Sequence, residues 1–276
     1  MKGLKKMMVA VVALGMLAGC SGGSSAATEN STGERKAPAE ITVYFTRHGK
    51  TMLNTTEKAQ GWSDAPLTPT GIEVAEAVGK GIGDSIKFDR VYTSDSGRAI
   101  ETAELILENA DQKAPIKKDK RLREFNFGTF EGVPSEEMIV GIAKDKKVDP
   151  EEYFEEAAKG GFVNLNKQLA NDLAEVDKKN VKEGENWPAE SYETVEARGK
   201  EAVEDIVSDA EKNGDDSILV VSHGMTLATI LNELDPNVAK EIPASGLENA
   251  SISKAVYKDG KWKVESVNDM GYVEKE

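Results

Sequence analysis

Two stretches of this chain end in a histidine followed by a glycine, and each follows a run of apolar residues. They are Ile41-Thr42-Val43-Tyr44-Phe45-Thr46-Arg47-His48-Gly49 and Ser217-Ile218-Leu219-Val220-Val221-Ser222-His223-Gly224. The chain has only 2 histidines, so both lie in such a stretch. Runs of β-branched and aromatic residues of this length predict buried strands. We therefore expect both imidazoles at the carboxyl ends of strands, where open α/β sheets bind their ligands.

Two arginines and a glutamate can join the histidines in one site. Arg47 directly precedes the first histidine, Arg98 lies at the start of a predicted helix, and Glu124 lies in a loop with three phenylalanines. Arginine stays charged and matches phosphate oxygens bidentately. The helix expected after Gly224 would add backbone N–H groups and a dipole of favourable sign. This set of groups predicts a site for a phosphate dianion.

An imidazole in such a site can attack phosphorus and form a phosphohistidine, which divides one displacement into two easier steps. A carboxyl group is then needed to protonate the leaving oxygen and afterwards to activate water. Positioning and charge stabilisation supply most of the rate in phosphoryl transfer. The scheme requires no metal and no cofactor. Glu124, Glu131 and Asp64 all lie in loops, so the residues alone leave the identity of the carboxyl group open.

The elements around these residues alternate between strand and helix. Thr68 is placed as N-cap and Pro69 as first residue of a helix that ends at Gly83. Strands are then expected at 88–94, 115–119 and 217–222, helices at 94–107 and 225–234, and a hairpin of strands 251–257 and 261–266 around Asp259-Gly260. This order predicts a three-layer α/β sandwich with a mostly parallel central sheet.

Residues from Pro134 to about Lys212 are almost wholly helical and charged in pattern, with breaks at Gly160-Gly161 and between Gly184 and Pro188. We expect residues 134–186 to form an inserted helical cap. The helix expected over 191–212 returns to the layers of the sheet. The folded domain is predicted to span 41–276.

The first forty residues carry an export pattern. Three lysines precede an apolar run at 7–17 that is too short to span a membrane, and Leu17-Ala18-Gly19-Cys20 follows. That tetrapeptide resembles the lipobox of bacterial lipoproteins. The resemblance implies cleavage of residues 1–19, a lipid on Cys20, and attachment to the extracytoplasmic face of the cell membrane. An ordinary secretory signal with an incidental cysteine is the alternative. Residues 20–40 have the composition of a flexible tether.

The formal net charge is −14. An acidic surface is repelled by nucleic acid and by anionic lipid, so we expect no nucleic-acid partner. Cys20 is the only cysteine, which excludes an intrachain disulfide. Any bound anion must be held by a local group of cations.

Five blocks of sequence together resemble the histidine phosphatase superfamily, also called phosphoglycerate mutase-like. They are Thr46-Arg47-His48-Gly49-Lys50-Thr51-Met52-Leu53-Asn54, residues 60–68, residues 93–103, residues 122–132, and Val221-Ser222-His223-Gly224. The resemblance implies that His48 is the phosphorylated nucleophile. It implies that Arg47, Arg98 and His223 hold the phosphate, helped by Asn54 and the N–H of Gly224, and that Glu124 is the acid and base. His223 is followed by Gly224-Met225 and not by an acid, which supports Glu124.

The sequence favours a phosphomonoesterase acting on a small extracytoplasmic phosphorylated substrate. A mutase needs further cations for a doubly phosphorylated intermediate, and no arginine occurs between Arg123 and Arg198. The Gly61-Trp62-Ser63-Asp64 segment is mutase-like, so a phosphoglycerate mutase-type phosphotransferase is one alternative. A catalytically inactive lipoprotein that binds phosphoanions is another. The physiological substrate and the oligomeric state are open.

Overall fold

A six-stranded sheet in the order β3-β2-β4-β1-β5-β6 forms the centre of the molecule. The computed structural model describes residues 36–273, to which every statement on structure below refers. The strands are β1 (Ile41–Arg47), β2 (Arg90–Thr93), β3 (Ile116–Lys118), β4 (Ser217–Ser222), β5 (Ile252–Lys258) and β6 (Lys261–Asp269). The first four run parallel to one another, β5 runs antiparallel to β1, and β6 runs antiparallel to β5. The expected mostly parallel sheet is confirmed.

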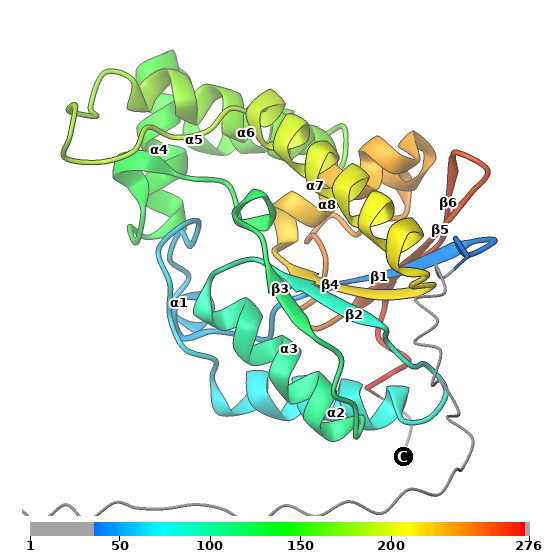
Figure 1. Cartoon of the computed structure of the whole chain (residues 1–276). Helices are drawn as coiled ribbons and strands as arrows, with labels where there is room; N and C mark the ends of the chain where they lie inside the picture. The colour runs from blue at the N-terminus through cyan, green and yellow to red at the C-terminus, as the bar shows by residue number, and fades with distance from the viewer. Residues whose placement is uncertain (1–35, 274–276) are drawn as a thin grey trace, which may run out of the picture. The chain divides into compact units, whose positions relative to one another are not determined.

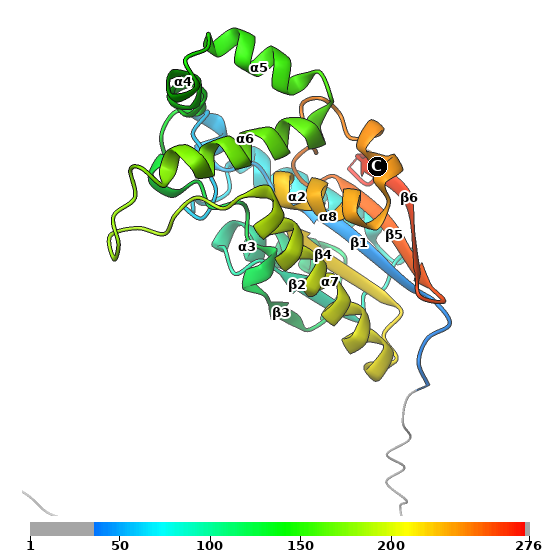
Figure 2. The same cartoon turned by 90° about the horizontal axis from the view of Figure 1, so that it is seen from above.

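Helices cover both faces of this sheet (Figures 1 and 2). On one face lie α2 (Pro69–Ile82) and α3 (Gly97–Asn109), and on the other lie α7 (Tyr192–Asn213) and α8 (Gly224–Leu234). Buried apolar side chains form two clusters accordingly: Phe45 packs with the α7 and α8 side chains, whereas Tyr44 packs with those of α2 and α3. The three-layer α/β arrangement is therefore confirmed.

Strand β4 is buried on both faces because it lies between β2 and β1. Ile218 and Val220 belong to the cluster under α7 and α8, and Leu219 and Val221 to the cluster over α2 and α3. A strand covered on both faces is apolar throughout, which explains its unbroken hydrophobic run. The parallel pairing of β4 with β1 brings their carboxyl ends side by side.

The helix starts follow local side-chain chemistry. Thr68 caps α2 by accepting a hydrogen bond from Gly71 N–H at 3.1 Å, as expected. Helix α3 begins at Gly97 and not at residue 94, because Ser94 N–H still pairs with Val221 O in the sheet. An unexpected short helix, α1 (Met52–Thr55), follows the first His-Gly pair.

Three helices occupy the segment predicted as a cap: α4 (Ser135–Lys146), α5 (Pro150–Ala158) and α6 (Phe162–Asp177). They lie beyond the carboxyl end of β1 (Figures 1 and 2). The break before α6 coincides with Gly161, whose φ is 81°. The break between α4 and α5 was not expected. Lys147 there takes a left-handed conformation, and Asp149 caps α5 ahead of Pro150.

The closing hairpin turns through Asp259 and Gly260, whose φ values of 50° and 75° suit a two-residue turn of type I′. Short 3₁₀ turns occur at Lys120–Leu122, Gly128–Phe130 and Pro236–Lys240.

Within residues 36–273 no helix has the length and hydrophobicity needed to cross a bilayer. The predicted signal peptide, the Cys20 lipidation site and most of the predicted tether lie outside the described residues.

Candidate phosphoryl-transfer site

The two histidines meet at the carboxyl ends of β1 and β4. His48 N–H donates to Ser222 O at 3.0 Å, and the ring centroids of His48 and His223 lie 5.2 Å apart. Both side chains are buried. The structure thus brings together the two residues that the sequence placed at separate strand ends.

The hydrogen bond of His48 defines which ring nitrogen is free to react. Its Nδ1 lies 2.8 Å from Gly49 O, and a carbonyl oxygen can only accept, so Nδ1 carries the proton. In a neutral imidazole the other nitrogen, Nε2, then holds a lone pair. This tautomer suits His48 as a nucleophile through Nε2.

His223 has the opposite tautomer. Its Nδ1 lies 3.0 Å from Arg98 Nη2, and a guanidinium can only donate, so Nδ1 is the acceptor and Nε2 carries the proton. Among the described residues this buried Nε2 finds no hydrogen-bond partner. A buried donor without a partner is costly, which marks the position that an oxygen of a bound anion would occupy.

Burial lowers the pKa of both histidines well below the usual value of 6.5. Next in importance is the positive charge of Arg98, and Arg47 adds to the effect in both cases. Desolvation and nearby cations both disfavour the imidazolium ion. Both rings are therefore neutral at neutral pH, as the two tautomers require.

Arg98, in the first turn of α3, is almost fully buried and holds the loop over the site. Its Nη1 donates to Ser63 O and Asp64 Oδ1, both at 2.9 Å, and its Nη2 donates to Gly61 O at 2.7 Å. Its Nε has no partner within the described part of the chain. Asp64 is thus the counterion of Arg98. Arg98 can offer an anion Nε–H and its charge, rather than the bidentate pair that the sequence predicted.

Arg47 reaches the site from the end of β1. Its Nη1 donates to Leu247 O at 2.6 Å, while its buried Nε lacks a partner among residues 36–273. Burial lowers the pKa of Arg47, and the charge of Glu124 opposes this. A Cβ on Gly224 would lie 3.3 Å from Arg47 Nε, so a glycine lets the guanidinium pack against the start of α8.

Glu124 lies at the amino end of α8, beside His223. Its Oε1 accepts from Thr226 N–H at 2.9 Å and from Phe125 N–H at 3.1 Å, and its Oε2 accepts from Met225 N–H at 3.1 Å. The carboxylate is buried, and its charge acts on both Arg47 and Arg98. It therefore lies in the same group of charges as the predicted phosphate-holding residues.

The other two carboxyl groups have structural partners. Glu131 accepts hydrogen bonds from the backbone N–H groups of Gly61, Trp62, Ser63 and Phe127. It fixes the turn whose carbonyls bind Arg98. Glu124 is hydrogen-bonded as well, but its charge acts on both Arg47 and Arg98, whereas the charges of Asp64 and Glu131 act on Arg98. Proximity to both guanidiniums favours Glu124 as the carboxyl group for proton transfer.

The two predicted helpers, Asn54 and the N–H of Gly224, differ in their surroundings. Asn54 Oδ1 accepts from Thr51 N–H at 3.1 Å and so closes α1 onto the end of the first motif. At the start of α8, Glu124 takes the N–H groups of Met225 and Thr226, and Leu227 N–H bonds to His223 O. This leaves the N–H of Gly224 as the donor of that turn that can face an anion.

Sequence reasoning missed the residues that hold the Glu124 loop. Ser222 Oγ donates to Leu122 O at 2.7 Å, and Arg198 of α7 donates to the carbonyls of Arg121, Arg123 and Glu124. The sequence gives one indication of Arg198: it is the first arginine after Arg123.

The assembled groups can accept a phosphate monoester. A neutral imidazole presents a lone pair, a second imidazole presents an N–H, two guanidiniums supply positive charge, and a helix begins at the same point. Such a set of groups is chemically suited to phosphoryl transfer.

The model of the histidine phosphatase superfamily (branch 1) matches residues 43–146 and 138–270, and the chain belongs to this family. A probable phosphoglycerate mutase, GpmB, of Yersinia pestis (strain Pestoides F) is 28% identical over 239 residues, which are 85% of this chain and 95% of that protein.

Solved structures agree with this assignment. The phosphoglycerate mutase of Bacillus anthracis is 40% identical, with a TM-score of 0.74 over 87% of this chain and 98% of that one. YhfR of Bacillus stearothermophilus is 26% identical, with a TM-score of 0.63 over 84% of this chain and 99% of that one. The family and its relatives support phosphoester hydrolysis or transfer as the general activity.

Proposed function

We propose that the chain is a metal-independent phosphomonoesterase that works through a phosphohistidine on His48, with Glu124 as general acid and base. The observation that carries this proposal is the pair of opposite tautomers. His48 Nε2 has a lone pair to attack phosphorus, while His223 Nε2 has a proton to bind a phosphoryl oxygen. Electrostatic stabilisation comes from Arg47 and Arg98, which is the main requirement of phosphoryl transfer.

The arginines favour hydrolysis over a mutase reaction. Arg123 is paired with Asp95 at 2.6 Å, and Arg198 with Glu190 at 2.9 Å, so neither is free for a second phosphate. No arginine occurs between them in the sequence. A bisphosphorylated intermediate needs further cations that these residues do not supply.

A phosphoglycerate mutase-type transferase is the second candidate. The 40% identity with the phosphoglycerate mutase of Bacillus anthracis and the name of the Yersinia pestis relative favour it. Phosphorus NMR with 3-phosphoglycerate, with and without 2,3-bisphosphoglycerate, separates the two. Accumulation of inorganic phosphate alone supports the phosphatase, whereas formation of 2-phosphoglycerate supports the mutase.

The decisive experiment is a rapid quench of residues 36–276 with a chromogenic phosphomonoester in EDTA, followed by mass spectrometry under conditions that preserve phosphohistidine. We expect phosphate on the His48 peptide and steady turnover. Absence of both over a broad panel of esters would contradict the proposal. Retained phosphate binding in that case would indicate an inactive phosphoanion-binding protein.

We also propose that the enzyme acts at the extracytoplasmic face of the cell membrane, anchored by a lipid on Cys20, on a small phosphorylated substrate. The Leu17-Ala18-Gly19-Cys20 segment after a short apolar run supports this. Labelled fatty acid should enter the full chain but not a Cys20→Ser variant, and the variant should leave the membrane fraction. Equal labelling of both chains would contradict anchoring through Cys20.

A further inference from the structure

The backbone of the Glu124 loop is held by side chains from three elements. Four consecutive carbonyls, from residue 121 to residue 124, each accept a hydrogen bond from a side chain. Ser222 at the end of β4 binds the carbonyl of Leu122, and Thr226 of α8 lies 2.9 Å from that of Arg123. One residue of α7 donates to the carbonyls of Arg121, Arg123 and Glu124.

That residue is Arg198, and its five N–H donors are all used. Its Nη1 donates to Arg121 O at 2.6 Å and to Arg123 O at 2.7 Å, and its Nη2 donates to Glu124 O at 2.9 Å. Its Nε and Nη2 also donate to the two carboxylate oxygens of Glu190, both at 2.9 Å. A guanidinium has five donors in a rigid fork, which a lysine cannot reproduce.

Glu190 binds the backbone on the carboxyl-terminal side of Glu124. Its Oε2 accepts from Asn126 N–H at 3.0 Å, and its own N–H donates to Asn126 O at 2.9 Å. The side chains of Arg198 and Glu190 are only 14% and 13% exposed, so the pair is shielded from water and salt. Arg198 and Glu190 therefore hold the chain on both sides of Glu124.

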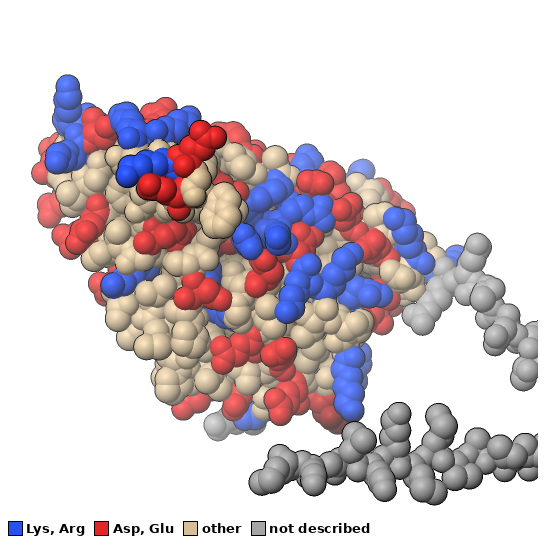
Figure 3. Space-filling model, turned by 60° about the vertical axis from the view of Figure 1, so that its left-hand side comes forward, with Lys and Arg blue, Asp and Glu red and all other residues tan. Residues whose placement is uncertain are grey.

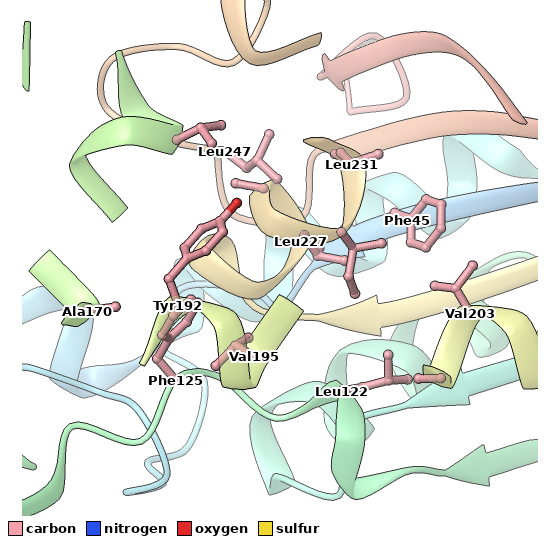
Figure 4. Close-up of a cluster of buried hydrophobic side chains, with 14 of the residues drawn as sticks. Phe45, Leu122, Phe125, Ala170, Tyr192, Val195, Val203, Leu227, Leu231 and Leu247 are labelled. Atoms are coloured by element: carbon pink, nitrogen blue, oxygen red, sulfur yellow. The ribbon is translucent and has the colours of Figure 1, made fainter. Parts of the chain in front are cut away.

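Apolar contacts fix the same loop from beneath. Leu122 and Phe125 are fully buried in the same cluster as Tyr192 and Val195 of α7, and Phe125 lies beside Tyr192 (Figure 4). The rings of Phe125 and Tyr192 are 6.3 Å apart. The side chains of Leu122 and Phe125 thus point into the core, while the carboxylate of Glu124 is directed at the start of α8.

The carbonyl and the carboxylate of Glu124 are fixed from opposite directions. The carbonyl accepts from Arg198 and, at 3.0 Å, from Trp62 Nε1, while the carboxylate accepts from the amino end of α8. Since both groups branch from one Cα, a shift of the backbone would move the carboxylate relative to His48. Proton transfer depends on such placement to within a fraction of an ångström.

We propose that Arg198 is a positioning residue for proton transfer by Glu124, an inference that rests on the proposed phosphatase function. In the first step His48 Nε2 forms a bond to phosphorus as the ester P–O bond breaks, and the Glu124 carboxyl gives its proton to the leaving oxygen. In the second step water attacks phosphorus, the P–N bond breaks, and the Glu124 carboxylate takes the proton of the water. Arg198 acts only through the position of Glu124.

The test is the dependence of kcat/KM on the leaving group, because kcat/KM reports the first, phosphoryl-transferring step. An acidic phenol leaves without a proton, whereas an alkoxide needs one. Arg198→Lys should lose about 10²-fold in kcat/KM with a simple alkyl phosphate and less than about 5-fold with 4-nitrophenyl phosphate. Glu190→Gln should show the same selectivity with a smaller loss.

Controls separate this role from a general loss of structure. Arg90→Lys changes another arginine that is paired with a carboxylate, Asp215, at the opposite end of the sheet, and should leave both substrates unaffected. Glu124→Gln should show the selective loss, and Arg198→Lys should add little to it, because residues that act through one another are not additive. Equal loss on both esters, or no loss, overturns the assignment. No turnover by the parent chain overturns the proposed phosphatase itself.

Discussion

The two His-Gly strand ends differ far more in the structure than in the sequence. Both follow buried strands, and they lie next to each other in the sheet. His48 donates from Nδ1 to the carbonyl of its own neighbour, whereas His223 accepts at Nδ1 from Arg98. One imidazole is thereby a lone-pair donor at Nε2 and the other a proton donor at Nε2. The same motif thus supplies opposite chemistry.

The difference arises from a third element and not from the strands. Arg98 comes from α3 and reaches the histidine of β4, while the backbone after β1 turns back to close on its own histidine. A guanidinium can only donate and a carbonyl can only accept, so each partner allows one tautomer. Partners distant in sequence therefore assign the roles of two similar motifs.

Among the changes in the site, removal of His48 should have the largest effect. We expect His48→Ala to lose on the order of 10⁶-fold in turnover, as for other covalent nucleophiles. Quenched samples should contain no phosphoenzyme. Phosphate found instead on His223 would show that the roles have been assigned the wrong way round.

Replacement of His223 should give a smaller and different loss. His223→Ala removes one N–H donor, and such a donor is worth about 10²–10³-fold in rate. Phosphoenzyme on His48 should still form, more slowly, when followed by rapid quench. Loss as complete as that of His48→Ala, with no phosphoenzyme at any time, would contradict the distinction between the two histidines.

Arg98→Lys tests the side chain that sets the tautomer of His223. A lysine cannot replace the bonds to Gly61 O, Ser63 O and His223 together, and each buried group left unpaired costs about 1–3 kcal/mol. We expect a free energy of unfolding lower by about that amount in urea titrations. Arg90→Lys, which changes a less buried arginine paired with Asp215, serves as the matched control and should cost less. Unchanged stability of the lysine variant would contradict this account.

The pH dependence of stability should report both histidines. Their pKa values are lowered by burial, so the unfolded chain binds more protons as the pH falls. This stability is fully present above pH 6.5 and is lost below it, by about 1 kcal/mol in total between pH 7 and pH 6. Denaturant titrations of the parent and of the double His→Asn variant measure it. Equal slopes of stability against pH for the two proteins would mean that folding does not lower the pKa values of the rings, and would contradict this account.

Much of the site could be predicted from the sequence because strand ends are local features. The runs before His48 and His223 predict strands, and parallel strands converge at one edge. The resemblance and the absence of an acid after His223 already favour Glu124 in the sequence, but the donors that each of Glu124, Glu131 and Asp64 accepts from are determined only by the fold. The role of Arg198 was likewise hidden, since its partners are backbone carbonyls without a sequence pattern.

The start of α5 in the cap could have been predicted from the sequence. Asp149 followed by Pro150 is a typical helix start, yet the segment was expected to be continuous helix up to Gly160.

Acidic and basic side chains are interspersed on the face of the molecule in Figure 3. That pattern agrees with the expectation that the chain does not bind nucleic acid, which stays a prediction.

The position of β4 between β2 and β1 links activity to the order of folding. The first strand of the domain finds its parallel neighbour only after the cap and α7 have been synthesised. Contacts of such long sequence separation form late and fold slowly. Until then Arg98 lacks its bond to His223, and the two imidazoles are not yet side by side. We therefore expect a truncated chain that ends before β4 to release no phosphate from phosphate esters. Turnover would thus report completion of the sheet, and refolding could be followed by the return of phosphate release.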